Sequence, residues 1–262
     1  MFIQKKNLLL AAVALLALGA APSITRSPLF KVARISIEGL RLLEREEILA
    51  LSGIAPGANL YEMDLKDAAA RIEAHPMIKN ARIVRTPPDG VLITVVERTP
   101  LALISLETLC GIDEEGVLIP FHPTFVDLPV ITGVSLKAYT LGRPVSEEGL
   151  SRCLALLKGA RKAAPDLWEQ ISEVRPGPDR VVLNLVGDGL EVWMQADAVP
   201  AQAEKFRALE TARWSALPSY VDLRFSGQVV VGPPKARPEN EHKKEKLKKQ
   251  QEGRPLSVSS KQ

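Results

Sequence analysis

The sequence VLITVVERTP, residues 91–100, decides the fold of the first half of this chain. It is a β-rich run that ends at Arg98, and a second β-rich run precedes it at residues 79–85. The residues between the two runs, Thr86-Pro87-Pro88-Asp89-Gly90, contain a Pro-Asp-Gly turn, and this combination is typical of a β-hairpin. Pro100 then marks a domain boundary, so the hairpin ends the first folded module.

Upstream residues complete this module with one strand and two helices. Residues 33–38 alternate between apolar and polar side chains, which is the period of a half-buried strand. Residues 44–51 predict a short helix that Gly53 can end in a left-handed conformation. Asp64 is a good N-cap for the next helix, whose apolar residues share one face, and Pro76 stops that helix.

Downstream of the hairpin the pattern changes to short strands with two helices. The helices are predicted at residues 146–164 and 201–215, and the last strand pattern covers residues 220–231, with an interruption near Ser226-Gly227. Residues 233–262 are rich in Pro, Lys, Glu and Gln and are not expected to fold alone. The other predicted strands are residues 101–106, 109–112, 117–119, 130–131, 171–174, 181–186 and 190–194.

The composition excludes several classes of protein. Of 262 residues, 46% are apolar, which is enough for a sizeable core and excludes a wholly disordered chain. Residues 233–262 carry nine Lys or Arg against four Glu, which leaves 25 basic and 27 acidic residues in 1–232. The body of the protein therefore gives no support for a nucleic-acid partner. Two cysteines cannot build a disulfide framework; Cys110 and Cys153 form either one bridge or two buried thiols.

The N-terminal segment predicts export. Lys5 and Lys6 precede the apolar residues 8–21, and the stretch 8–24 consists of 17 uncharged residues. As a helix these span about 25 Å, at ~1.5 Å per residue, against a bilayer core of ~30 Å. A single membrane span at about residues 7–24 and a cleaved signal peptide, with small residues at 17–21, both fit the pattern.

No catalytic constellation is found in the sequence. His75, His122 and His242 lack metal-ligand spacing, and the chain contains no CxxC, HExxH, GxSxG or P-loop motif. The segment Asp113-Glu114-Glu115-Gly116 is predicted to be a hairpin turn rather than a cation site. We therefore predict no catalytic, cofactor-binding or metal-binding residues, and binding of a partner rather than catalysis.

Several motifs carry a resemblance to a known family. They are Ile37-Glu38-Gly39-Leu40, Leu51-Ser52-Gly53-Ile54, Gly57-Ala58-Asn59-Leu60, His75-Pro76-Met77-Ile78-Lys79-Asn80-Ala81, Val95-Val96-Glu97-Arg98-Thr99-Pro100-Leu101-Ala102 and Tyr220-Val221-Asp222-Leu223-Arg224-Phe225-Ser226-Gly227. With these motifs the chain resembles the bacterial cell-division FtsQ family, called DivIB in Gram-positive bacteria. POTRA modules of the same kind occur in outer-membrane assembly and translocation factors, which are the alternative.

The resemblance implies an α+β fold with five parts. Residues 1–6 are cytoplasmic, residues 7–24 form a single transmembrane helix, and residues 25–98 form a POTRA domain with two helices on a three-stranded sheet. Residues 99–232 form a β-rich domain whose two helices cover one face. Residues 233–262 are a disordered basic tail, although contact of this tail with anionic lipid or wall polymers stays open.

The implied function is that of a non-enzymatic divisome scaffold, which helps to control septal peptidoglycan synthesis. Its expected partners are FtsB- and FtsL-like single-span proteins and the septal peptidoglycan synthase complex, without nucleic acid, small-molecule substrate or cofactor. The expected location is the cell inner membrane at the division septum, as a single-pass type II protein with its C-terminal domains in the periplasm.

The last strand pattern predicts where a partner binds. Val221, Leu223 and Phe225 alternate with the residues between them, so one row can face the core and the other can face outward. As the final element before the tail, this strand is expected at a sheet edge, where a partner strand can add, unless it is an ordinary strand without an open edge. The resemblance places an FtsB-like partner here, and Gly227 is expected to bend the chain. The predicted partner-binding residues are Tyr220, Asp222, Arg224, Phe225, Ser226, Gly227, Val229, Val231 and Gly232.

Overall fold

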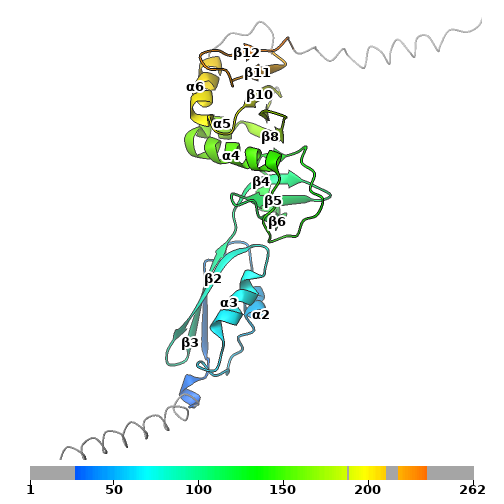
Figure 1. Ribbon diagram of the computed structural model, residues 1–262. Helices are drawn as coiled ribbons and strands as arrows, with labels where there is room; N and C mark the ends of the chain where they lie inside the picture. Colours follow the sequence, from blue (N-terminus) through cyan, green and yellow to red (C-terminus); the bar gives the residue numbers. More distant parts are fainter. Residues whose placement is uncertain (1–26, 188, 211–217, 235–262) are drawn as a thin grey trace, which may run out of the picture. The chain divides into compact units, whose positions relative to one another are not determined.

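The computed structural model describes residues 27–187, 189–210 and 218–234 (Figure 1). The chain divides into two compact units. Unit 1 consists of the residues up to 130 together with residues 134–148, and unit 2 consists of residues 131–133 together with the residues from 149 onward. The predicted transmembrane segment and nearly all of the basic tail lie outside the described residues. Among the described helices, none has the length and apolar character needed to cross a membrane.

Unit 1 begins with the module predicted around the hairpin. Its three strands are ordered β1-β3-β2, with β1 (Arg34–Glu38) parallel and β2 (Ile78–Thr86) antiparallel to the central β3 (Gly90–Glu97). The short helix η1 (Pro28–Phe30) precedes this sheet, and α2 (Arg45–Ser52) and α3 (Leu65–Glu73) lie beside it (Figure 1). Their shared core includes the fully buried Ile48, Leu60, Ile72 and Ile93. The order of elements expected from the sequence and the mixed α+β class are confirmed.

Local signals explain the ends of these elements. Gly53 ends α2 with φ +66°, and the Asp64 carboxylate caps α3 by accepting the N–H groups of Lys66 and Asp67. Gly39 has φ +90°, and a Cβ at this position would collide with the backbone carbonyl oxygen of Val95. The segment after β1 therefore requires glycine for its conformation and for its close approach to β3.

Three antiparallel strands of a second sheet complete unit 1. They are β4 (Pro100–Ser105), β5 (Leu109–Asp113) and β6 (Leu118–Pro120), followed by the short helix η2 (Pro123–Phe125). Unit 1 therefore contains both the hairpin module and these strands, and the domain boundary at residue 98 stays a prediction. The residues packed in one apolar cluster of unit 1 are Leu42, Leu43, Met77, Leu103, Ile119, Phe125, Leu128 and Val130.

Unit 2 contains a five-strand arrangement ordered β12-β11-β10-β9-β8. The strands β8 (Ile171–Pro176), β9 (Val181–Leu185) and β10 (Glu191–Met194) form the predicted antiparallel meander. The strand β11 (Tyr220–Asp222) is parallel to β10, and β12 (Val230–Val231) is antiparallel to β11. Between the units in sequence lies β7 (Val130–Ile131).

Three helices belong to unit 2. They are α4 (Glu148–Ala163), α5 (Pro165–Trp168), which the sequence did not predict, and α6 (Val199–Glu210). The predicted extension of the last helix to residue 215 lies outside the described residues.

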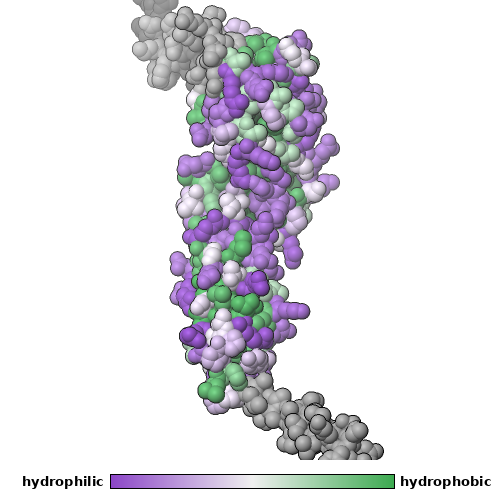
Figure 2. Space-filling view, turned by 90° about the vertical axis from the view of Figure 1, so that its left-hand side faces the viewer, coloured by the Kyte–Doolittle hydropathy of each residue, from purple (hydrophilic) through white to green (hydrophobic). Residues whose placement is uncertain are grey.

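The sheet of unit 2 has one fully buried row of side chains: Val174, Leu183, Val192 and Val221 lie next to one another across four strands and are at most 1% exposed. The opposite row is Arg175, Val182, Trp193 and Asp222. Both cysteines are buried and free, so the alternative of two thiols is correct. Figure 2 shows hydrophilic and apolar residues interspersed on the visible surface.

Candidate partner-binding site

The predicted site residues gather at one end of the unit 2 sheet, but they are not one strand. The strand β11 has neighbours on both sides, because Tyr220 pairs with Glu191 of β10 and Val221 pairs with Val231 of β12. The expectation of a sheet edge is therefore wrong for residues 220–222, whereas the interruption expected near Ser226-Gly227 is confirmed and separates two strands. The chain reverses at Gly227, which has φ +71° in a turn, and β12 folds back onto β11.

The last strand of the sheet, within the described residues, is β12. Val230 and Val231 are 38% and 41% exposed. The Gly232 N–H donates to the Tyr220 carbonyl oxygen at 2.8 Å, so residues 230 and 232 make the hydrogen bonds to β11. Because bonded residues alternate along an antiparallel ladder, Val229 and Val231 direct their N–H and C=O groups away from β11. This edge has unpaired backbone groups of the kind that accept a further strand.

An aromatic stack lies next to this edge. The Tyr220 ring is parallel to the Trp193 ring, with centroids 3.9 Å apart, and the Arg180 guanidinium lies 4.0 Å from the centroid of Trp193. Gly232 permits the stack, because a Cβ there would come within 2.6 Å of the Tyr220 ring. No local pattern in the sequence indicates a role for Trp193 or Arg180, since only the tertiary structure brings them to Tyr220.

We expect Gly232→Ala to displace the Tyr220 ring and to destabilise unit 2 by about 1–3 kcal/mol, the usual cost of overpacking. The measurement is near-ultraviolet circular dichroism, in which the signal of the stacked rings should decrease. Gly227→Ala is the matched control: its Cβ meets open space, so it should cost about 1–2 kcal/mol for the left-handed backbone and leave the aromatic signal unchanged. An unaltered aromatic signal in Gly232→Ala would contradict the stated role of Gly232.

An ion-pair network holds β11 to the β8–β9 turn. Arg224 donates to both carboxylate oxygens of Asp222, at 2.9 and 2.8 Å, and to Asp179 at 2.5 Å. Asp222 lies in the row opposite the fully buried one, as expected, but it is only 3% exposed. Burial raises the pKa of Asp222, but the hydrogen bonds from Arg224 outweigh burial and leave this pKa below its usual value. The same arginine lowers the pKa of Asp179.

These pKa shifts predict an acid-sensitive unit 2. A carboxyl group whose pKa is lower in the folded state contributes stability above its unfolded pKa, and this contribution is lost as pH falls. The thermal midpoint should therefore be stable above about pH 5 and fall below about pH 4. Arg224→Gln removes the cause of both shifts and should flatten this dependence in calorimetric scans. An equal pH dependence in the two proteins would show that other groups control it.

The turn between β11 and β12 is fixed by a helix. The Lys205 ammonium of α6 donates to the carbonyl oxygens of Leu223, at 3.0 Å, and Phe225, at 2.6 Å. Phe225 is 44% exposed whereas Leu223 is fully buried, so the predicted row of Val221, Leu223 and Phe225 facing the core ends after Leu223. No local signal in the sequence indicates this contact of Lys205.

The acidic turn and the two described histidines that the sequence offers as possible ligands make contacts within the fold. The Asp113 carboxylate accepts the N–H groups of Glu115 and Val117 and pairs with Arg98 at 2.6 Å, as expected for a hairpin turn. His122 caps η2. His75 lies 3.3 Å from Glu47. The described part of the chain contains no group of three His, Cys, Asp or Glu able to hold a metal ion.

Comparisons with known proteins show what this chain is similar to. Residues 30–98 match the family model "POTRA domain, FtsQ-type". The cell division protein FtsQ of Syntrophotalea carbinolica is 38% identical over 150 residues, which are 56% of this chain and 53% of that protein. FtsQ of Geotalea daltonii is 25% identical over 85% of this chain and 83% of its own length. The solved extracytoplasmic domain of DivIB from Geobacillus stearothermophilus has 16% identity and a TM-score of 0.29, covering 45% of this chain and 98% of that domain.

The first sheet and the match of residues 30–98 to the family model define a protein with a POTRA domain. Strands of a second sheet and unit 2 follow this domain in the chain. The relatives that this chain resembles are bacterial cell division proteins named FtsQ. The match to the Syntrophotalea carbinolica protein spans about half of that relative's length.

Proposed function

We propose that this protein is a non-enzymatic divisome scaffold, anchored in the inner membrane by residues 7–24, that binds single-span division proteins in the periplasm. Similarity to cell division proteins named FtsQ and the match of residues 30–98 to an FtsQ-type POTRA domain support a role in cell division. The observation that carries the binding mode is the open edge of β12, with Val230 and Val231 exposed at the end of the described sheet. In this proposal an FtsB-like partner adds a strand to β12, and FtsL-like proteins and the septal peptidoglycan synthase assemble with it.

The surroundings of β12 support a partner strand. Residues 225–228 are exposed and join the turn to the edge, so a strand that pairs with Val229 and Val231 can also contact Phe225. Backbone hydrogen bonds would supply register and affinity, and the Phe225 side chain would supply apolar contact area. Arg224, Tyr220 and Gly232 would act indirectly, because they hold β11 and β12 in place.

Depletion of the protein from its own host tests the function. We expect long filaments without septa, with outer-membrane proteins inserted normally, because the chain would connect septal components. A complementing chromosomal copy is the control. Normal septation combined with a defect in outer-membrane protein insertion would contradict the proposal and favour an assembly factor with a POTRA domain.

A further inference from the structure

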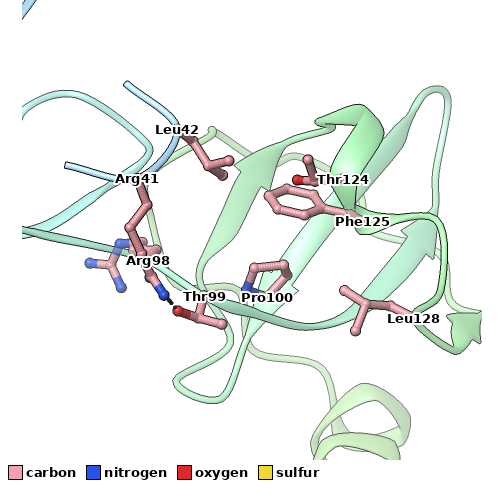
Figure 3. Close-up of a pocket in the computed structure, with 8 residues that line it drawn as sticks. All are labelled: Arg41, Leu42, Arg98, Thr99, Pro100, Thr124, Phe125 and Leu128. Carbon is pink, nitrogen blue, oxygen red and sulfur yellow. Dashed lines mark hydrogen bonds between the residues drawn. The ribbon is translucent and has the colours of Figure 1, made fainter. Parts of the chain in front are cut away.

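Unit 1 contains an apolar pocket of about 270 Å³ between the segment after β1 and the second sheet (Figure 3). The side chains of Leu42, Pro100 and Phe125 face a common space, and Leu128 lies at its end (Figure 3). This volume is slightly below the range of about 300–1,000 Å³ usual for small-molecule sites. The pocket therefore fits one large side chain better than a whole cofactor.

Among the described residues that line the pocket, the charged ones are two arginines, Arg41 and Arg98. Arg98 is paired with Asp113 at 2.6 Å and with Glu115 at 3.3 Å. Arg41 instead donates to two uncharged acceptors, the Thr99 hydroxyl at 2.7 Å and the Glu97 carbonyl oxygen at 3.4 Å. Within the described part of the chain no carboxylate pairs with Arg41, so its charge is available to an incoming anion.

Exposed apolar side chains flank η2, the short helix that carries the lining residues Thr124 and Phe125. Val126 and Phe121, on either side of η2 in the sequence, are 66% and 41% exposed. Exposed large apolar side chains are typical of surfaces that bind protein rather than a free small ion.

We propose that this pocket binds a short acidic segment of a partner protein, with one aromatic or long aliphatic side chain in the pocket and a flanking carboxylate on Arg41. The tail of this chain does not fit, because residues 233–262 carry nine basic against four acidic residues and would be repelled by Arg41. The site is separate from β12, so it neither requires nor contradicts strand addition there.

The test is a ligand-observed NMR titration of the full-length chain in detergent with three capped peptides. These are acetyl-Asp-Phe-Glu-amide, its uncharged counterpart acetyl-Asn-Phe-Gln-amide, and acetyl-Asp-Ala-Glu-amide, which lacks the large side chain. We expect the first peptide to bind about fivefold tighter than the uncharged peptide, which is the size of one exposed ion pair. We expect a similar factor against the alanine peptide, because that peptide buries less apolar surface in the pocket.

Variants assign the binding to the pocket. Arg41→Gln should remove the preference for the acidic peptide, and Arg41→Lys should keep most of it. Both variants should fold as the parent does, because each keeps the backbone N–H at position 41 that donates to the Glu97 carboxylate. Arg82→Gln, an exposed arginine elsewhere in unit 1, is the matched control and should bind as the parent does. Equal binding of the three peptides, unchanged preference in Arg41→Gln, or displacement by equimolar inorganic phosphate would overturn the proposal.

Discussion

Val229→Pro is expected to weaken binding of an FtsB-like strand peptide by at least about 30-fold, because the open edge of β12 loses a backbone donor and gains a ring that obstructs the adjacent strand. The fold should survive this change, since residues 230 and 232, rather than Val229, bond to β11. The measurement is isothermal titration of the full-length chain with the peptide, together with circular dichroism of each variant.

Two further variants sharpen this test. Val229→Thr keeps the donor and the β-branched shape, so it should bind the peptide nearly as the parent does. Phe225→Ala keeps the edge but removes an exposed ring, and we expect it to weaken binding as well. Normal affinity in a correctly folded Val229→Pro protein would rule out strand addition at β12.

Glu97→Ala is expected to destabilise unit 1 by about 2–4 kcal/mol, since Glu97 holds the segment that follows β1. The Glu97 side chain is buried, and its carboxylate accepts the backbone N–H groups of Arg41, Leu42 and Leu43 at 2.8, 2.9 and 3.1 Å. Removal of the carboxylate leaves three donors without an acceptor and also changes the pocket at Leu42.

Urea unfolding, followed by a probe in unit 1, measures this effect. Glu97→Gln keeps one acceptor oxygen and should lose less stability than Glu97→Ala. Glu107→Ala, an exposed glutamate in the same unit, should change stability by less than about 0.5 kcal/mol. If Glu97→Ala and Glu107→Ala have the same midpoint, the three hydrogen bonds do not contribute as stated.

The sequence by itself determined the first module of unit 1. Its signals are local: Asp64 caps a helix with its own side chain, Gly53 supplies a left-handed residue, and the turn after Thr86 joins two β-rich runs within a few positions. The motif around Glu97 was also visible. Each of these features depends on residues close in the chain, so the residue types and their spacing suffice to predict them.

Only the tertiary structure decided the arrangement of the candidate partner site. Alternation along residues 220–231 has the same period whether the chain continues or reverses, so it could not reveal that β12 folds back onto β11. Lys205 reaches the Phe225 carbonyl across 20 positions, and Arg224 reaches Asp179 across 45. Contacts between residues so far apart depend on how the strands pair and where α6 packs, and no local pattern in the sequence records either.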